Sequence, residues 1–439
     1  MDQSSSAWIP GARSTPRVGR LVGPTGALVV LLLVSFFLRV LWLDRPTDPQ
    51  GHADQIFDER YYLSAARTIL GLPQADDAPY AHSPAGRDPN REHPPLAKLI
   101  IAGDMATLGD NAWGWRWASV VAGTLGIAFV YLLARRVGLG DWAAVLAAFL
   151  YAFDNLVFVS SRIGTLDIFM LLGMLAGAAW FVAKRPVLAS LAFAFGALCK
   201  EYGVYGPAII FLYLVAKTLH ERPGWKEVVL RALRLLAMGA VFLGVFVFAL
   251  WQLDLHWSTY ANPLAHLQAI WSYGTELTHP HGPTGIEIWP WEWLINEVQI
   301  PYLKVVVTDC KITASPCPTD DIIRQFDSVL FRGALNPYLI AALPLALAYL
   351  ISRLGGEDNR VALLSLIWFG VASLPFIPAA AVDRRIEYLY YMLPVVPAIA
   401  LGCAALFADR RMPRAVTWGF VAAILYGFAR YFPFTGFRL

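Results

Sequence analysis

The stretch that decides the fold is "LVGPTGALVVLLLVSFFLRVLWL" (residues 21–43), which is followed closely by "QIFDERYYLSAARTIL" (residues 55–70). The first stretch is long enough to cross the roughly 30 Å hydrocarbon core of a bilayer as a helix. The second places two adjacent carboxylates, Asp58 and Glu59, where the chain should leave the membrane. Ionised side chains avoid lipid unless something holds them there. The sequence therefore raises the question of what this carboxylate pair does at the mouth of a bilayer.

Similar apolar runs recur along the 439 residues, separated by charged or proline-rich breaks. The chain is 57% hydrophobic and only 15% charged, whereas soluble domains carry roughly 25% charged residues. This pattern predicts an all-α polytopic membrane protein. We expect eleven spans: residues 21–43, 113–134, 141–158, 163–183, 187–200, 203–219, 235–254, 335–352, 361–378, 388–408 and 415–431.

The charges of the connecting loops predict the orientation of these spans. If the N-terminus is cytoplasmic, every inner loop is basic and the outer loops are acidic or mixed, as the positive-inside rule requires. The inner basic residues are Arg135-Arg136, Lys184-Arg185, Lys217 to Arg234, Arg353 to Arg360 and Arg410 to Arg414. The protein is therefore expected in the plasma membrane, with residues 44–112 and 255–334 forming extracytoplasmic loops.

The remaining organisation is simple. Residues 1–20 are polar and basic and predict a disordered cytoplasmic tail, while residues 21–439 form a single membrane domain with no internal repeat. Within the first outer loop, residues 59–70 and 94–109 predict short helices that lie in the membrane interface. In the second outer loop, "WPWEW" (residues 289–293) would rest on the bilayer surface or wall a cavity. Cys310 and Cys317 could form a disulfide if this loop faces an oxidising compartment.

Asp58 has an ordinary interpretation as well as a functional one. It stands at the N-cap position of the helix that begins at Glu59, where a carboxylate can accept hydrogen bonds from free backbone N–H groups. Arg60 and the helix dipole would also favour a carboxylate there. On this stretch alone, capping and chemistry both remain open.

The stretch "NREHPPLAKLI" (residues 90–100) adds further polar groups to the same outer loop. Glu92 and His93 precede a rigid double proline, and Lys98 follows on the first turns of a helix. This arrangement could position a polar group near the membrane surface. The alternative is a plain turn with Lys98 snorkelling to the interface.

Other charges stand at the predicted outer ends of spans. Taken together they converge on one side of a helical bundle, which makes them functional candidates. For Lys200-Glu201 we favour a local ion pair or interfacial anchor. The remaining members of the set are Arg116, Arg162, Asp167, Asp383, Arg384, Arg385 and Glu387.

Other common chemistries have no signature in this sequence. His279 and His281 are flanked by prolines and are read as loop residues rather than zinc ligands. No Walker motif or GxGxxG pattern occurs, which argues against a nucleotide as direct donor. No nucleic acid is expected as a partner.

The constellation resembles the protein O-mannosyltransferases, a family of GT-C membrane glycosyltransferases. The resemblance rests on seven stretches that occur in the family's order along most of the chain. These are "FDERYY" (57–62), "HPPLAK" (93–98), "GWRWAS" (114–119), "SRIGTLDIFM" (161–170), "WPWEW" (289–293), "LNPYLI" (335–340) and "YLYYMLPVVPAIALG" (388–402). The long outer loop is too short for the β-trefoil domain of eukaryotic members, so the chain looks like the compact bacterial enzymes.

The resemblance implies a GT-C fold of about eleven helices and a specific reaction. Such enzymes transfer mannose, with inversion, from a polyprenyl-phosphate carrier to Ser/Thr hydroxyls of exported proteins. Because a hydroxyl is a poor nucleophile, a carboxylate must accept its proton. Asp58 matches the family's proposed base, and Glu59 would orient the acceptor or support Asp58. No cofactor is firmly implied; a divalent metal occurs in the wider GT-C class but is not expected here.

The lipid phosphate that departs in this reaction needs fixed cations. Arg116 matches a functionally important arginine of the family, and we add Lys98 and Arg385 as candidates. His93 could orient Glu92 or contact the donor. Arg162 and Asp167 are further candidates without an assigned role.

Two alternative functions remain open. The same chemistry could serve a lipid or cell-wall glycan as acceptor instead of a protein. A transporter or flippase is a third reading, but transporters often show repeated halves and charges at the membrane midplane, which this sequence lacks.

Overall fold

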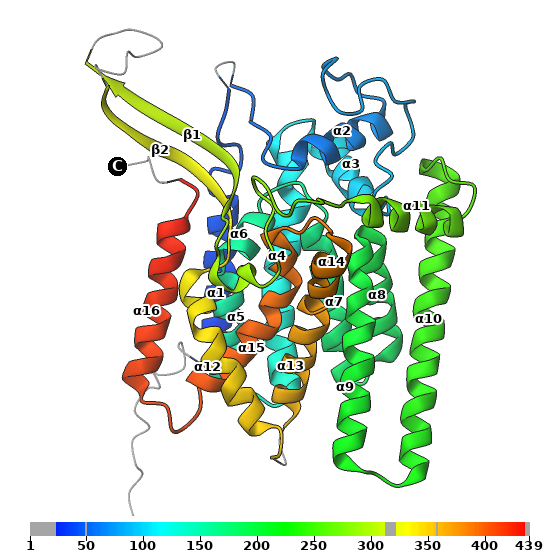
Figure 1. Cartoon of the computed structure of the whole chain (residues 1–439), viewed down its shortest axis with the longest axis vertical. Coiled ribbons are helices and arrows are strands. Elements are labelled where there is room, and N and C mark those ends of the chain that lie inside the picture. Colours follow the sequence, from blue (N-terminus) through cyan, green and yellow to red (C-terminus); the bar gives the residue numbers. More distant parts are fainter. Residues whose placement is uncertain (1–22, 49–50, 312–321, 357–358, 435–439) are drawn as a thin grey trace, which may run out of the picture.

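Long helices form a bundle in which most helices run side by side (Figure 1). A computed structural model describes residues 23–48, 51–311, 322–356 and 359–434. The predicted tail, residues 1–20, lies outside this range. Eleven of the helices in the described part of the chain fall within the predicted spans or extend beyond them. They are α1 (Pro24–Val40), α4 (Ala112–Val137), α5 (Asp141–Ala152), α7 (Asp167–Val182), α8 (Pro186–Cys199), α9 (Tyr205–Glu221), α10 (Trp225–Trp257), α12 (Pro337–Arg353), α13 (Arg360–Ser373), α15 (Val396–Phe407) and α16 (Arg414–Tyr431).

Five helical segments of the described chain are long and apolar enough to cross a membrane. Another five apolar helices, α1, α5, α7, α8 and α12, are shorter. These findings confirm a multi-pass helical fold, whereas the exact number of eleven crossings stays a prediction. The five long segments are Ala112–Val137, Glu201–Glu221, Trp225–Trp257, Arg360–Asp383 and Leu389–Phe407.

Small residues let the helices at the centre of the bundle approach closely. A side chain at Gly173 on α7 would lie 2.5 Å from the Cα of Gly196 on α8, and one at Gly177 would lie 2.3 Å from the ring of Phe193. In a membrane, where burial of apolar surface adds little, such close van der Waals packing is what holds helices together. The close packing of α7 and α8 therefore fixes the position of Lys200 and Glu201, which directly follow α8.

A buried polar junction interrupts the predicted span 141–158. Asp154 ends α5 and caps α6 (Asn155–Ser160) by accepting a hydrogen bond from Val157 N at 3.0 Å. Its second oxygen accepts from Asn336 N at 2.9 Å, and Asn336 in turn caps α12. The carboxylate therefore joins two helix N-termini, whose unpaired N–H groups favour a negative charge.

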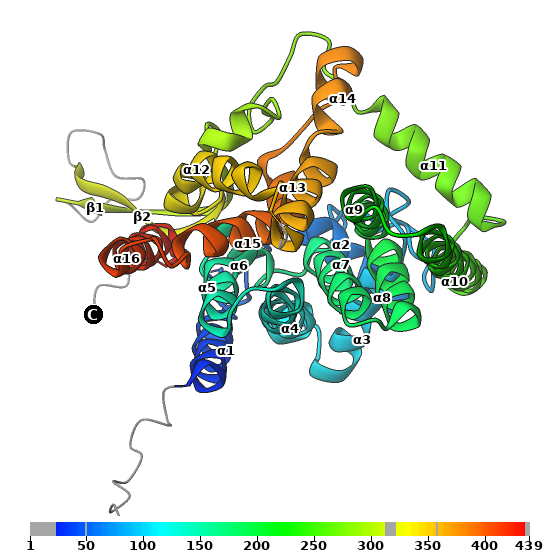
Figure 2. The same cartoon turned by 90° about the horizontal axis from the view of Figure 1, so that it is seen from below.

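Shorter elements gather at one end of the bundle, which we call the α2 end. Here α2 (Glu59–Leu70) and α3 (Leu96–Leu108) confirm the two predicted loop helices, and α11 (Pro263–Glu276) lies at the same end of the bundle (Figure 1). Seen along the bundle, α11 and α14 (Phe376–Asp383) lie at its periphery, on the side of α9 (Figure 2). The α2 end is where most of the predicted site residues meet.

A β-hairpin is the one element type that the sequence analysis did not predict. Strand β1 (Ile300–Cys310) pairs antiparallel with β2 (Ile322–Gly333), with Val305 opposite Val329. The hairpin projects beyond the helices at the α2 end (Figure 1). Cys317 lies outside the described residues, so its disulfide with Cys310 stays a prediction.

Candidate active site

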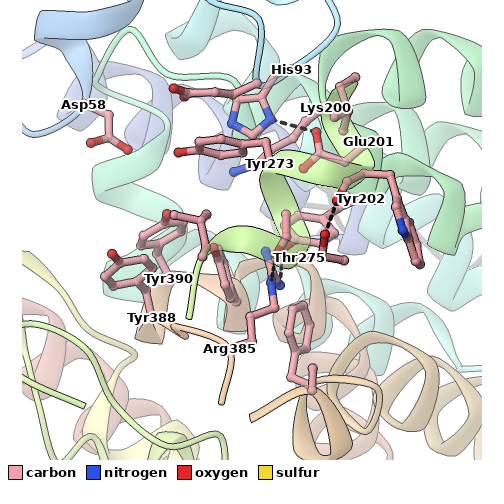
Figure 3. A pocket seen from close by; sticks show the side chains of 18 of the residues that line it. Asp58, His93, Lys200, Glu201, Tyr202, Tyr273, Thr275, Arg385, Tyr388 and Tyr390 are labelled. Carbon is pink, nitrogen blue, oxygen red and sulfur yellow. Dashed lines mark hydrogen bonds and ion pairs between the residues drawn. The ribbon is translucent and has the colours of Figure 1, made fainter. Parts of the chain in front are cut away.

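A cavity of about 1030 Å³ opens at the α2 end of the bundle (Figure 3). Side chains from segments far apart in the sequence line it, and most are aromatic or ionisable. They include Phe57, Asp58, Tyr61 and Tyr62 beside α2; Glu92 and His93; Lys200, Glu201, Tyr202 and Tyr205; Tyr273 and Thr275 on α11; and Phe376, Asp383, Arg385, Tyr388, Tyr390 and Tyr391. The convergence of outer-end charges predicted from the sequence is thus found in part.

Asp58 lines this cavity with an unpaired carboxylate. It occupies the N-cap position of α2, but its side chain makes no capping hydrogen bond; its backbone carbonyl accepts from Tyr61 N at 3.0 Å instead. Within the described residues, no hydrogen bond or ion pair engages its side chain. The capping interpretation is therefore wrong. Burial raises the pKa of Asp58 to about 6, although Lys200 opposes this shift.

The residues on either side hold Asp58 in place. Phe57 adopts a positive φ of 56°, an uncommon conformation for a side chain of its size. Its N–H donates to Tyr302 O at 3.1 Å and its ring stacks on that of Tyr302 with centroids 4.1 Å apart. Strained backbone of this kind clusters at functional sites, and here it fixes the start of α2.

Glu59 points away from the cavity, although it is adjacent to Asp58. It is fully buried and accepts from Arg116 Nε at 2.8 Å and Nη2 at 2.7 Å. It also accepts from the backbone N–H groups of Ile56 and Gly164, each at 2.7 Å. The structure therefore does not bring Glu59 to the acceptor side of the site.

Arg116 and Lys98, both candidates for phosphate binding, are also absent from the cavity lining. The remaining donors of Arg116 reach Leu43 O and Asp54 O at 2.7 Å. Lys98 is fully buried and contacts Asp88 at 2.6 Å, Asn90 O at 2.6 Å and His93 O at 3.0 Å. It neither snorkels nor faces the site, but it fastens the turn that carries Glu92 and His93.

Two cations do face the cavity, Lys200 and Arg385. Lys200 Nζ lies 2.8 Å from Asp167 Oδ1, and it stands over the ring of Tyr390 at 5.4 Å. The sequence analysis favoured a local ion pair or interfacial anchor for Lys200-Glu201. Both residues do form ion pairs, Lys200 with Asp167 and Glu201 with His93, and both also line the cavity.

Arg385 is held from two sides. Its Nε donates to Gly274 O on α11 at 2.9 Å, and Nη1 donates to Tyr202 Oη at 3.1 Å (Figure 3). Glu387 lies beside it, with Oε1 3.7 Å from Nη1. The predicted candidate Arg385 is thus part of the cavity wall.

His93 and Glu201 form a pair in the cavity lining. His93 Nδ1 lies 2.7 Å from Glu201 Oε2 (Figure 3). Glu92 lies on the same turn and its Oε2 accepts from Asn90 Nδ2 at 3.3 Å. His93 therefore pairs with Glu201 rather than with Glu92, and a contact of His93 with the donor stays a prediction.

Aromatic side chains make up another wall. Tyr388 and Tyr390 stack with centroids 5.4 Å apart, and Tyr391 stacks on Phe376 at 5.3 Å. Behind them, Trp293 is 1% exposed and packs against Phe376. The tryptophan-rich stretch thus supports the cavity wall, as one of its two predicted roles required. The tyrosine-rich stretch at 388–391 was the feature of the sequence that indicated the tyrosines of this wall.

The last two candidates lie outside the cavity lining. Arg162 donates to Leu41 O at 2.7 Å and Trp42 O at 3.2 Å, and so caps the C-terminal end of α1. Asp167 is not among the lining residues but pairs with Lys200, which is. Among the residues that the structure describes, no three His, Cys, Asp or Glu side chains gather as a metal-binding set; the expected lack of a metal requirement stays a prediction.

Comparison with known proteins finds similarity to one family of membrane glycosyltransferases. Residues 92–251 match the family model described as dolichyl-phosphate-mannose-protein mannosyltransferase. The chain also superimposes on a structure of the S. cerevisiae protein O-mannosyltransferase Pmt1-Pmt2 complex bound to the sugar donor, with a TM-score of 0.67 and 12% identity over 95% of this chain and 91% of that chain. The fold is that of the GT-C glycosyltransferases.

Curated relatives agree with the family resemblance. A polyprenol-phosphate-mannose–protein mannosyltransferase of Mycolicibacterium smegmatis is 30% identical over 156 residues, which cover 36% of this chain but only 28% of that protein. The Corynebacterium glutamicum protein of the same name is 22% identical over 76% of this chain and 74% of its own length. The resemblance inferred from the seven stretches is confirmed, and the chain matches about a quarter of the length of the first relative.

Proposed function

We propose that the protein transfers a sugar, mannose, from a polyprenyl-phosphate carrier to Ser/Thr hydroxyls of exported proteins. The observation that carries this proposal is the unpaired carboxylate of Asp58 in a cavity that Lys200 and Arg385 also line. A base and fixed cations in one cavity match a reaction between a neutral hydroxyl and an anionic leaving group. The family resemblance supplies the identity of the donor.

The reaction would proceed in one step. Asp58 accepts the proton of the acceptor hydroxyl while the hydroxyl oxygen attacks the anomeric carbon of the sugar. The bond from that carbon to the phosphate oxygen breaks, and polyprenyl phosphate leaves with one additional negative charge. Direct attack inverts the anomeric centre, and the proton remains on Asp58 until water removes it.

Lys200 and Arg385 are the cations that we assign to the leaving phosphate. Both are fixed by other groups, Lys200 by Asp167 and Arg385 by Gly274 O and Tyr202. Cations that are fixed before the reaction stabilise the developing charge without reorganisation. The rings of Tyr388, Tyr390 and Tyr391 supply flat apolar surfaces for the sugar ring.

The remaining candidates are positioning residues, which hold the groups that line the cavity in place. Glu59 and Arg116 fix the start of α2 and thereby the direction of Asp58. Lys98 fixes the turn before α3, and Glu201 fixes the ring of His93. On this proposal the α2 end faces outward, because the basic loops at the other end mark the cytoplasm.

A transfer assay with a panel of substrates tests the proposal. Purified protein would be offered polyprenyl-phosphate-mannose or polyprenyl-phosphate-glucose together with a Ser/Thr-rich peptide or a native lipid extract, and products would be read by mass spectrometry. We expect one hexose on the peptide with the mannose donor. Sugar found only on lipid would replace the protein acceptor with a lipid or glycan, and no product from any combination would overturn the proposal.

A further inference from the structure

A second cavity lies against the other face of α2. Its volume is about 410 Å³. Arg60, Ser64 and Arg67 line it, and these positions follow one another at i, i+4 and i+7, which is one face of a helix. Tyr61 and Tyr62 line the first cavity from the opposite face. Helix α2 is therefore a partition between two cavities.

The two cavities share one lining residue, Phe57. Phe57 directly precedes Asp58, so the cavities meet at the N-terminal end of α2, beside the carboxylate. The positive φ of Phe57 and its stacking on Tyr302 hold it at that position.

We propose that the second cavity binds the residues of the acceptor polypeptide that flank the modified hydroxyl, with Arg60 favouring acidic side chains there. This inference rests on the proposed function. An extended chain advances about 3.3 Å per residue, so residues two to four positions from the hydroxyl would reach past the end of α2. A polar cavity of this size fits short peptide side chains.

The charges of the second cavity select its occupant. Arg67 is already paired, because its Nε and Nη2 donate to Asp110 at 2.8 and 3.0 Å. Arg60 is exposed, its guanidinium lies 5.4 Å from the ring centroid of Tyr61, and within the described residues it makes no ion pair. Asp77 contributes the one carboxylate of the lining. The cation available to a ligand is therefore Arg60.

Three peptides test this inference. Each carries one Thr, and the residues two to four positions away on both sides are Glu, Gln or Lys. With the mannose donor, wild-type protein should modify the Glu peptide about fivefold more efficiently, in kcat/KM, than the Lys peptide, as one exposed charge pair allows. Arg60→Gln should remove this preference, and Arg60→Glu should reverse it.

A matched control variant, Arg45→Glu, distinguishes a specific effect of Arg60 from a general effect of charge. Arg45 is exposed, lies in the same loop and lines neither cavity, so Arg45→Glu should keep the wild-type preference. Thermal melting would verify that every variant is folded. An unchanged preference in folded Arg60→Glu would overturn this inference while leaving the proposed function intact. If wild-type protein modifies none of the three peptides, the proposed function fails and the inference fails with it.

Discussion

Asp58 has no partner in the described structure, unlike three other carboxylates in or beside the cavity. Glu201 is paired with His93, Asp167 with Lys200, and Glu92 with the side chain of Asn90. A paired carboxylate is stabilised in its charged form, whereas a buried one without a partner binds a proton more readily. That difference is what suits Asp58 to accept a proton near neutral pH.

The first prediction concerns the acid side of the pH profile. Asp58 must be ionised to act as a base, and burial raises its pKa to about 6. We therefore expect kcat/KM for the acceptor to fall about tenfold per pH unit below pH 6 and to level off above it. Initial rates between pH 4.5 and 8 measure this. A profile that stays flat down to pH 5 would contradict the assignment of Asp58.

The second prediction concerns Glu387 and the alkaline side. Burial raises the pKa of Glu387 to about 8, against the effect of Arg385, and neither carboxylate oxygen has a hydrogen-bond partner in the described structure. Below pH 8 Glu387 is neutral and Arg385 keeps its full charge for the phosphate. Above pH 8 Glu387 ionises, so the KM for the donor should rise. Glu387→Gln should abolish that rise; if it persists in this variant, Glu387 is not its cause.

Sequence reasoning at this scale found Asp58, His93, Glu92 and Arg385, which line the cavity. It placed Glu59 beside Asp58 in function because the two are adjacent in sequence. Successive residues of a helix, however, point about 100° apart, and at the start of α2 this sends the second carboxylate toward Arg116. Two residues that are adjacent in the sequence therefore differ in their surroundings: Asp58 lines the cavity, whereas Glu59 anchors α2 to Arg116.

At the scale of elements, α2 depends on its anchor. Glu59 is fully buried with Arg116, which is 1% exposed. Removing one partner of a buried ion pair leaves an uncompensated charge, which costs about 3–5 kcal/mol. We expect Glu59→Gln to lower the free energy of unfolding by that order and to lower the melting temperature of the detergent-purified protein.

The exposed pair Arg135–Asp141 is the matched control for this third prediction. Its side chains are 39% and 50% exposed, so solvent screening limits its contribution to less than about 1 kcal/mol. Asp141→Asn should therefore change the melting temperature little. Equal melting temperatures for Glu59→Gln and wild type would show that Glu59 does not anchor α2.

Helices could be predicted from long apolar runs, and α4 and α10 contain their predicted spans. The hairpin could not be predicted in the same way. Residues 300–310 stood in a loop read for its tryptophans, although Val305, Val306 and Val307 are β-branched residues that favour strands. The two strands also pair across residues 312–321, and that distance hides the pairing from any local pattern.

At the scale of the whole molecule, the proposal requires the α2 end to face outward. The fourth prediction tests this with single cysteines at Arg60, in the second cavity, and at Arg222, between α9 and α10 at the other end. In a background with the native cysteines replaced by serine, a membrane-impermeant maleimide should label Arg60→Cys in intact cells. Arg222→Cys should be labelled only after permeabilisation. The reverse labelling pattern would show that the α2 end faces the cytoplasm and would contradict the proposal.

The most direct test of the central claim is the rate of Asp58→Asn in the purified transfer assay. Asn keeps the size of the side chain and removes its ability to accept the proton, and general base catalysis typically contributes 10²–10⁴-fold. We predict that the folded variant binds the mannose donor as wild type does but transfers hexose to a Ser/Thr peptide at least about 100-fold more slowly. Transfer at the wild-type rate would contradict the account and place the base elsewhere.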